Sequence, residues 1–326
     1  MDESFTRWRY NRVHEEGTIM KSIVLSTLAT TTVLLAAAAL ATPRDGRTGW
    51  SRANLDGVEL EYEIRGAGDP VVLVHAGILA DWFQPLLDDP TLVGRHRVVS
   101  YHRVGYAGSS RTTGPVSIAD QAGHLRSLMR HLGIGRAHVV GHSSGGNIAL
   151  QLALDAPQMV HSLVLMEPAL PVALGQDRML ATRAGMAPVL AAYRAGDKAA
   201  AIDGFMRIVS GPGYRAVLEQ RLPGAMERAV ADADTFFGQE LPSLQQWSFA
   251  RDEGRRITQP ALAVMGARSP DVSPIWPERQ QLLLTSLPKA ESFVLPEATH
   301  LLHVEQPRAM AEALVAFFAR HALVAR

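Results

Sequence analysis

The sequence of 326 residues contains no cysteine. This absence excludes thiol nucleophiles, disulfide bonds and thiolate metal sites, so covalent catalysis in this chain must use an oxygen nucleophile. It does not identify the compartment, because an exported protein with a large core can do without disulfides.

The chain also lacks an excess of charge of either sign. Lys and Arg together number 32, and so do Asp and Glu. This balance gives no reason to expect binding to nucleic acid or to an anionic membrane surface. Three ligand motifs are missing as well: a His-Glu-x-x-His metal site, a Walker phosphate loop and a dinucleotide-binding glycine pattern after the first strand. We therefore expect no metal site and no cofactor.

What is present is typical of a globular protein, since 47% of the residues are hydrophobic and 20% are charged. The length suggests roughly two domains, or one large domain that carries an insertion. Either arrangement can bury a large core.

The N-terminal region, residues 1–41, carries a targeting pattern. A basic start at Met20-Lys21 precedes an apolar run at residues 23–40 and a small-x-small exit that ends at Ala41. This pattern predicts a secretory signal peptide that is cleaved after Ala41, and hence a secreted or periplasmic protein. The run is also near the length of one spanning helix, so an uncleaved membrane anchor is the alternative. Residues 1–19 are then a gene-start artefact or a disordered cytoplasmic tail.

Short apolar runs rich in β-branched residues recur along the chain, as expected for strands that are covered on both faces. A hairpin at residues 54–65 precedes them, because Asp56-Gly57 favours a tight turn between two antiparallel strands. A helix is expected at residues 118–132, whose apolar residues form one stripe. This alternation predicts an α/β fold with a doubly wound, mostly parallel sheet. The apolar runs lie at residues 71–74, 97–101, 137–140, 162–166, 261–265 and 292–295.

The alternation of strands and helices is interrupted at residues 169–257. We expect this stretch to be a helical cap, and residues 50–168 and 258–326 to form one core around it. The helix-like segments of the cap lie at residues 186–194, 199–209 and 214–220.

The strongest chemical signal is the run Gly-His-Ser-Ser-Gly-Gly at residues 141–146. It follows a predicted strand directly and opens a helical stretch at residues 147–154. A serine on such a tight turn is held with its Oγ exposed, and flanking glycines permit close approach of the backbone. We therefore predict Ser143 as a nucleophile; a small-residue turn without chemistry is the alternative.

A serine hydroxyl needs a neighbouring base to remove its proton, so a histidine is required. Of the 12 histidines, His300 is the best placed, since it follows the last predicted strand and precedes the final helix. For the other histidines near motifs we expect structural roles, because a lone histidine more often packs than catalyses. These are His75, His102, His124, His142 and His303.

Three further segments resemble the α/β-hydrolase fold family. Residues 75–77, His-Ala-Gly, are similar to its His-Gly-x oxyanion loop, and residues 101–109 to its Asp-x-Arg-Gly-x-Gly-x-Ser segment. Residues 300–307 are similar to its Gly-His-x4-Glu-x-Pro ending. The resemblance runs from about residue 57 to residue 321 and implies a serine hydrolase with a helical cap. The departures, where the family usually has glycine, aspartate and glycine, are Ala76, His102 and Thr299.

The resemblance leaves two candidates for the acid of a catalytic triad. The family usually places an aspartate three residues after a glycine that follows the seventh strand, but Ser269 stands there and Asp271 comes two residues later. A second arrangement has the acid at the end of the sixth strand, where Glu167 stands. Either carboxylate preserves the order serine, acid, histidine and would orient the imidazole if it reached the ring. We favour Glu167 and keep Asp271 as the alternative.

The same resemblance implies an oxyanion hole. Its donors are the backbone N–H of Ser144, just after the nucleophile, and that of Gly77, in the loop after the third strand. Each such donor contributes roughly 3–4 kcal/mol in the transition state of an acyl transfer.

The predicted function is hydrolysis of an ester or a similar small acyl substrate through an acyl-enzyme on Ser143. Serine at this position argues against haloalkane dehalogenases and epoxide hydrolases, which resemble this scaffold but need aspartate there. The alternatives are acyl transfer or perhydrolysis on the same triad, or a non-catalytic ligand-binding protein on a hydrolase scaffold. We expect a small-molecule partner, no nucleic acid, and a membrane only if the N-terminal segment stays uncleaved. Apolar candidates for the pocket wall are Met186, Phe205, Met206, Phe236, Phe237 and Trp247.

Overall fold

The computed structural model describes residues 49–172 and 175–323. The predicted extension and signal peptide or anchor, residues 1–41, lie outside the described residues and remain a prediction. Among the described helices, none combines the length and the apolar character needed to cross a membrane.

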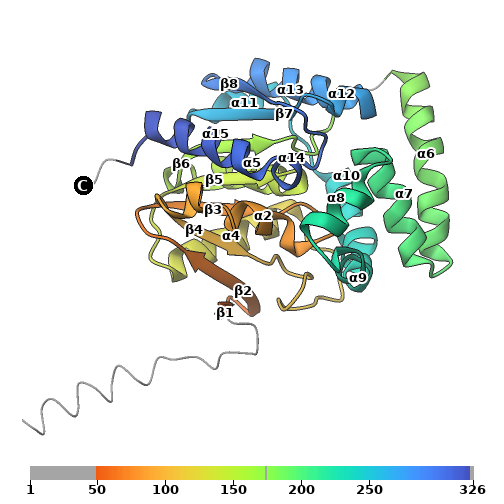
Figure 1. Cartoon of the computed structure of the whole chain (residues 1–326), viewed down its shortest axis with the longest axis horizontal. Coiled ribbons are helices and arrows are strands. Elements are labelled where there is room, and N and C mark those ends of the chain that lie inside the picture. Colours follow the sequence, from red (N-terminus) through yellow and green to blue (C-terminus); the bar gives the residue numbers. More distant parts are fainter. Residues whose placement is uncertain (1–48, 173–174, 324–326) are drawn as a thin grey trace, which may run out of the picture. The chain divides into compact units, whose positions relative to one another are not determined.

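Eight described strands form one sheet in the order β1-β2-β4-β3-β5-β6-β7-β8 (Figure 1). β2 runs antiparallel to both β1 and β4, whereas every other neighbouring pair is parallel. This arrangement confirms the predicted α/β class with a mostly parallel sheet. The strands are Ser51–Leu55 (β1), Val58–Arg65 (β2), Asp69–Val74 (β3), His96–Tyr101 (β4), Ala137–His142 (β5), Val160–Met166 (β6), Ala261–Gly266 (β7) and Ala290–Leu295 (β8).

The opening hairpin turns at Asp56 and Gly57, as predicted. Their φ angles are 52° and 91°, and Leu55 pairs with Val58 across the turn. Two consecutive residues with positive φ are the mark of a type I′ turn, whose twist matches that of the flanking strands.

The helices outside residues 169–257 belong to the core. α4 begins at a capping box, since the Ser117 Oγ accepts from the Asp120 N–H at 3.0 Å and the Asp120 carboxylate accepts from the Ser117 N–H at 3.0 Å. The core helices are η1 (Ala80–Phe83), α2 (Gln84–Leu87), α3 (Pro90–Val93), α4 (Ile118–His131), α5 (Ser144–Asp155), η2 (Pro157–Met159), α12 (Ser269–Val272), α13 (Ile275–Ser286), α14 (Leu302–Glu305) and α15 (Pro307–Arg320).

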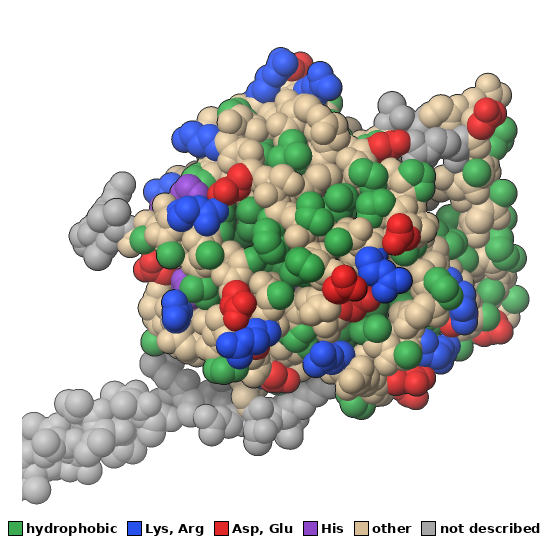
Figure 2. Space-filling view, turned by 45° about the horizontal axis from the view of Figure 1, so that its top comes forward, with side chains coloured by type: hydrophobic (Ala, Val, Ile, Leu, Met, Phe, Trp, Pro, Cys, Tyr) green, Lys and Arg blue, Asp and Glu red, His purple; other side chains and the backbone are tan. Residues whose placement is uncertain are grey.

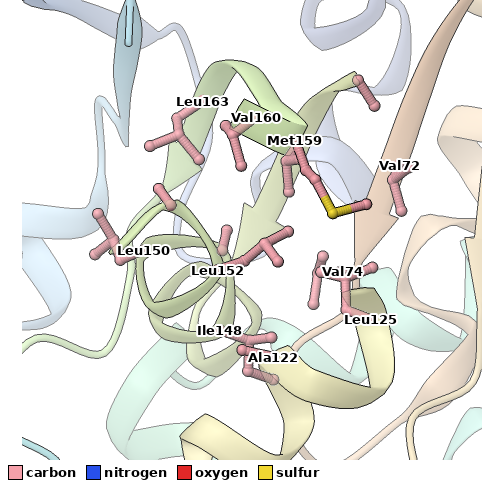
Figure 3. Packing of buried hydrophobic residues seen from close by; sticks show 14 of the residues in the cluster. Val72, Val74, Ala122, Leu125, Ile148, Leu150, Leu152, Met159, Val160 and Leu163 are labelled. Carbon is pink, nitrogen blue, oxygen red and sulfur yellow. The ribbon is translucent and has the colours of Figure 1, made fainter. Parts of the chain in front are cut away.

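β3 shows why the strand runs are continuously apolar. Val72 and Val74 face one side of the sheet, where they pack in one core with residues of α4 and α5 (Figure 3). Val71 and Leu73 face the other side and pack in a second core with residues of α15. Because both faces are covered, alternation with polar residues would bury unpaired polar groups.

The described helices between β6 and β7 all fall within the stretch predicted as a cap, although the boundaries at residues 169 and 257 remain a prediction. In Figure 1, α6 to α9 lie together beside the sheet. Their apolar residues share a third core with residues of the loop after β3 and of the loop after β8. The helices are α6 (Gln176–Arg194), α7 (Lys198–Ser210), α8 (Tyr214–Arg221), α9 (Ala225–Ala231), the π-helix η3 (Thr235–Glu240), α10 (Leu241–Gln246) and α11 (Arg251–Arg256).

Candidate active site

Ser143 lies on the turn between β5 and α5. Its φ and ψ are 51° and −122°, a conformation that residues with a Cβ rarely adopt. Hydrogen bonds hold the turn on both sides: the Ser143 N–H donates to the Met166 carbonyl at 3.0 Å, and the Ser143 carbonyl accepts from the Gly146 N–H at 2.8 Å. The surrounding backbone therefore maintains a strained turn with serine at its tip.

Steric contacts explain the glycines on either side of Ser143. A Cβ on Gly141 would lie 2.5 Å from the Gly145 carbonyl oxygen, and a Cβ on Gly145 would overlap the Val74 carbonyl oxygen. Only glycine lets α5 start this close to β3 and β5. The Gly-x-Ser-x-Gly pattern is thus a packing requirement of this turn.

His300 and Glu167 form a buried pair. His300 lies in the loop after β8, and Glu167 follows β6 directly with a φ of 43°. The His300 Nδ1 and the Glu167 Oε2 are 2.7 Å apart. The other oxygen, Oε1, accepts from the Gly266 N–H at 2.8 Å. Both carboxylate oxygens therefore have partners, one of them the imidazole.

Asp271, the other predicted acid, does not reach this pair. It lies in the short helix α12, where it is exposed. Within the described parts of the chain, it makes no hydrogen bond or ion pair with His300. The geometry favours Glu167 as the acid because α12 turns Asp271 toward solvent.

The contacts of His300 define its tautomer. Because the Glu167 carboxylate only accepts, we place the proton on Nδ1, which leaves Nε2 as a free acceptor. The ring stacks on Trp276, with centroids 4.1 Å apart and an angle of 17° between planes. The His300 carbonyl accepts from the His142 Nε2–H at 2.9 Å. Burial lowers the pKa of His300, and the positive charge of Arg279 lowers it further. The imidazole is therefore uncharged at neutral pH.

Ser143 and His300 line one cavity of about 700 Å³. Gly77 and Ser144 line it too, so the structure brings five of the six predicted site residues to this region and leaves Asp271 outside. Phe237 does not line the cavity; its ring packs 5.0 Å from those of Tyr193 and Phe236. The other apolar cap residues named from the sequence do line it: Met186, Phe205, Met206, Phe236 and Trp247.

His75 fixes the direction of the Gly77 N–H. Its Nδ1–H donates to the Ala76 carbonyl at 2.7 Å, and its Nε2 accepts from the Arg103 N–H at 3.0 Å. The Ala76 carbonyl and the Gly77 N–H belong to one planar peptide unit, so orienting the first orients the second. Within the described residues, the Gly77 N–H has no acceptor. A donor is thus held in place without a partner beside the serine turn.

Gly77 also requires glycine for a reason that the sequence did not show. A Cβ there would lie 2.6 Å from the Phe236 ring and 3.1 Å from the Glu240 Oε1. Both residues belong to η3, so η3 packs directly on the loop of residues 75–77. Alanine is tolerated at position 76 because its side chain is buried in the core that this loop shares with the cap.

A buried ion pair between core and cap was missed by the sequence reasoning. Arg103 is fully buried, and its Nη2 lies 3.1 and 3.0 Å from the two carboxylate oxygens of Glu240. Tyr106 donates its hydroxyl hydrogen to the same carboxylate. Arg103 and Tyr106 stand within the recognised 101–109 segment, but nothing in the sequence marked Glu240 as their partner.

His102, which replaces the usual aspartate, has carboxylate partners of its own. Its Nδ1 lies 2.7 Å from the Glu61 Oε2 and its Nε2 lies 3.2 Å from the Asp81 Oδ1. Burial alone lowers the pKa of His102, but the interactions with Asp81 and Glu61 raise it above the ordinary value. Asp81 also pairs with Arg228 of α9 at 2.8 Å. Histidine is therefore accommodated at this position, where the family usually has aspartate, by the carboxylates of Glu61 in β2 and Asp81 in η1.

Thr299, which replaces the usual glycine, holds the loop that carries His300. Its N–H donates to the Glu305 Oε2 at 2.6 Å, and its hydroxyl donates to the Glu305 Oε1 at 3.1 Å. Threonine therefore adds a hydrogen bond that glycine lacks. In the described part of the chain, no group of three or more His, Asp or Glu side chains is arranged to hold a metal ion.

Two curated proteins and one solved structure place these observations among known proteins. A dihydrolipoyllysine-residue acetyltransferase component of the acetoin cleaving system, from Cupriavidus necator, is 36% identical over 124 residues, which are 38% of this chain and 33% of that protein. A 2-hydroxy-6-oxo-6-(2'-aminophenyl)hexa-2,4-dienoic acid hydrolase, from Metapseudomonas resinovorans, is 26% identical over 294 residues, or 84% of this chain and 92% of that protein. The chain thus matches only a third of the first relative's length but nearly all of the second.

The enol-lactonase from Burkholderia xenovorans LB400 has a similar crystal structure, with a TM-score of 0.69 at 20% identity over 82% of this chain and 100% of that one. At this identity the likeness bears on the fold alone. Residues 69–307 match the α/β hydrolase fold family. That match spans most of the chain and agrees with the observed sheet, so the chain belongs to the α/β hydrolase fold family.

Proposed function

We propose that this chain is a serine hydrolase that cleaves an ester or a similar small acyl substrate. Ser143 is the nucleophile, His300 the base and Glu167 the acid that orients it. The observation that carries the proposal is the buried His300–Glu167 pair at 2.7 Å, next to the cavity that Ser143 lines. Such a pair leaves the imidazole Nε2 free to accept the proton of a serine hydroxyl.

The proposed reaction has two halves. The Ser143 Oγ attacks the carbonyl carbon as His300 accepts its proton, and the resulting oxyanion accepts hydrogen bonds from the N–H groups of Gly77 and Ser144. His300 then gives the proton to the leaving oxygen, which leaves the acyl group on Ser143. Water, deprotonated by His300, attacks this ester and releases the acid. Glu167 stabilises the imidazolium in both halves without accepting its proton.

The name of one similar protein supports hydrolysis as the reaction class. The relative that matches 84% of this chain is named as a dienoic acid hydrolase. The preference for esters is our own proposal. It depends on the largely apolar cavity beside an activated serine, since such cavities favour small uncharged acyl groups near the reacting bond.

Labelling and turnover test this proposal directly. A fluorophosphonate probe is expected to label the wild-type protein at Ser143, and a series of 4-nitrophenyl esters of increasing chain length is expected to be hydrolysed. Ser143→Ala should abolish both, because it removes the hydroxyl that attacks the acyl group and reacts with the probe. Its thermal denaturation should match that of the wild type. Ester turnover that survives in Ser143→Ala contradicts the assignment of the nucleophile.

Acyl transfer is the second candidate, because one relative is named as an acetyltransferase component. In that reaction an alcohol replaces water in the second half. Added alcohol or hydrogen peroxide should then divert most of the acyl-enzyme from the carboxylic acid product. A protein whose Ser143 resists the fluorophosphonate would instead be a ligand-binding member of the family.

A further inference from the structure

One charged side chain stands out in the wall of the cavity. Arg279 of α13 lines it, and among the described residues that do so it is the only one with a permanent charge. Most of the remaining wall is apolar, from Met186 and Phe205 of the cap to Leu301 of the core. A cation in an apolar cavity is costly unless it has a partner.

The protein itself satisfies only part of this guanidinium. The Arg279 Nε–H donates to the Leu170 carbonyl at 2.9 Å, and the Arg279 Cζ lies 5.1 Å from the centre of the Trp276 ring. Leu170 and Trp276 both line the cavity, so the guanidinium lies at its wall. The four remaining N–H donors make no hydrogen bond with the described residues. Arginine keeps its charge at neutral pH, since burial lowers the pKa of Arg279 only to about 10.

Glu167 does not fill this gap. Its charge attracts Arg279, but its Oε2 pairs with His300 and its Oε1 with the Gly266 N–H. Among the described residues, no Asp or Glu lines the cavity, so the protein offers the guanidinium no carboxylate there. The four donors are therefore open to solvent or to a ligand that enters the cavity.

A second polar group without a partner lies in the same cavity. The Ser210 Oγ, at the end of α7, is buried and has no hydrogen-bond partner among the described residues. α7 packs against α12 there, since a Cβ on Gly211 would meet the Val272 side chain at 3.2 Å. Ser273 follows α12 and also lines the cavity. The contact between cap and core thus places the Ser210 hydroxyl beside the part of the cavity formed by α12 and α13, where its Oγ is almost completely covered.

We propose that this side of the cavity binds a carboxylate carried by the substrate, so the acyl substrate is a monoanion. A carboxylate accepts two parallel N–H bonds from a guanidinium, so it satisfies donors of Arg279 that have no partner among the described residues. Trp276 contacts the imidazole of His300 and the guanidinium of Arg279, so the anion lies a few bonds from the reacting carbonyl. This inference rests on the proposed hydrolase function and names the class of substrate for it.

Two matched pairs of esters test the inference. The first pair is the mono-4-nitrophenyl ester of glutaric acid and its methyl ester, which differ by a charge in the acyl part. The second is 4-butyryloxybenzoate and its methyl ester, which differ by a charge in the leaving group. In at least one pair, kcat/KM of the wild type should be about 10- to 100-fold higher for the acid, as a charge-assisted bidentate pair provides. Arg279→Met should reduce that ratio to about one, and Arg279→Lys should keep part of it.

The outcomes separate the two proposals. If the wild type hydrolyses the acid and the methyl ester of both pairs equally well, the carboxylate site is overturned and the hydrolase proposal is unaffected. The same conclusion follows if Arg279→Met lowers kcat/KM equally for the acid and for the methyl ester. The latter result would mean that Arg279 only supports Trp276 and Leu170. Failure of all four esters and of fluorophosphonate labelling overturns both proposals. If Arg279→Met does not fold, the Arg279→Lys ratio decides. Arg308→Met, at an exposed position of α15, is the control for loss of a positive charge and should keep the wild-type ratio.

Discussion

Glu167 and Asp271 are both carboxylates near the ends of neighbouring strands, and the side-chain environment separates them. Glu167 is buried, and burial raises its pKa. Its pKa is about 7, because the hydrogen bond from the Gly266 N–H and the positive charge of Arg279 offset only part of the effect of burial. Asp271 is exposed and makes no contact with the imidazole among the described residues. One residue therefore has a role in the proposed chemistry, and the other serves as its matched control.

Glu167→Gln is expected to reduce kcat by about 10⁴, because the amide no longer stabilises the imidazolium and favours the wrong tautomer. Asp271→Asn should change kcat by less than about threefold, since substitutions away from the reacting groups rarely cost more. Steady-state hydrolysis of one 4-nitrophenyl ester by both variants measures the difference. A larger loss in Asp271→Asn would reverse the assignment of the acid.

Glu167→Gln should also change how kcat/KM depends on pH. His300 must be neutral to act as a base, so activity falls on the acid side as the His300–Glu167 pair takes up a proton. Removing the carboxylate removes the nearest negative charge, which lowers the pKa of the imidazole. The acid limb of kcat/KM in Glu167→Gln should therefore lie at lower pH than in the wild type. A limb at the same or higher pH would mean that another group controls it.

The close packing around the serine turn predicts that a side chain at Gly145 lowers the stability of the protein. Gly145→Ala places a methyl group on the Val74 carbonyl and should lower the free energy of unfolding by about 1–3 kcal/mol or more. Gly123→Ala, in α4, meets nothing within 4 Å and should raise it by about 0.5–1 kcal/mol, because alanine is the better helix former. Urea denaturation of both variants gives the two values. Equal effects would show that the turn tolerates a side chain.

At the scale of elements, η3 brings two residues of the predicted cap against the loop after β3. Phe236 and Glu240 of η3 lie against Gly77, and Glu240 pairs with Arg103 of the core. Arg103 in turn donates to His75, which orients the peptide before Gly77. The cap is thus connected to a group that the proposed mechanism uses through the Glu240 and Arg103 side chains, the Arg103 backbone N–H and the His75 ring.

Glu240→Gln should leave Arg103 as a buried cation without its counter-ion, and it should lower the free energy of unfolding by about 3–5 kcal/mol. Because Arg103 supports His75, kcat should fall as well. Glu312→Gln removes an exposed partner of Arg308 and should change neither quantity measurably. Urea denaturation and ester hydrolysis measure the two effects. A Glu240→Gln variant with wild-type stability would show that the pair does not hold cap and core together.

On the scale of the whole molecule, charges of both signs are mixed. On the face shown in Figure 2, Lys and Arg side chains alternate with Asp and Glu and form no field of one sign. This agrees with the balance of 32 basic and 32 acidic residues. Mixed charge gives a phosphate backbone little to bind on that face, and a small molecule in the cavity remains the proposed partner.

We also propose that the chain is exported. Expression in a bacterium followed by fractionation should place it outside the cytoplasm, and mass spectrometry should find a mature N-terminus at Thr42. Ala41→Gln should block cleavage, because the exit requires a small residue. Full-length wild type in the membrane fraction would support the anchor instead, and full-length protein in the cytoplasm would contradict both readings.

The sequence determined the features that depend on short stretches of chain. The turn at Asp56-Gly57, the strand runs, the α4 helix and the Gly-x-Ser-x-Gly turn each follow from neighbouring residues, because backbone conformation and two-sided burial leave a local pattern. The chain order of Ser143, Glu167 and His300 was visible for the same reason. The choice between Glu167 and Asp271 was not, since it depends on where two loops from different strands end.

Only the tertiary structure decided which distant groups meet. Glu240 binds Arg103 across 137 positions of sequence, and Arg279 places a positive charge in the wall of the cavity. The residues next to Glu240 and Arg279 in sequence form no pattern that predicts either contact. Ion pairs and cavity walls are formed by side chains that lie far apart in sequence and at no regular spacing. Their partners can therefore be identified only once the cap is folded onto the sheet. Sequence therefore identified the strands, the α4 helix and the serine turn, and folding brought together the charges that surround them.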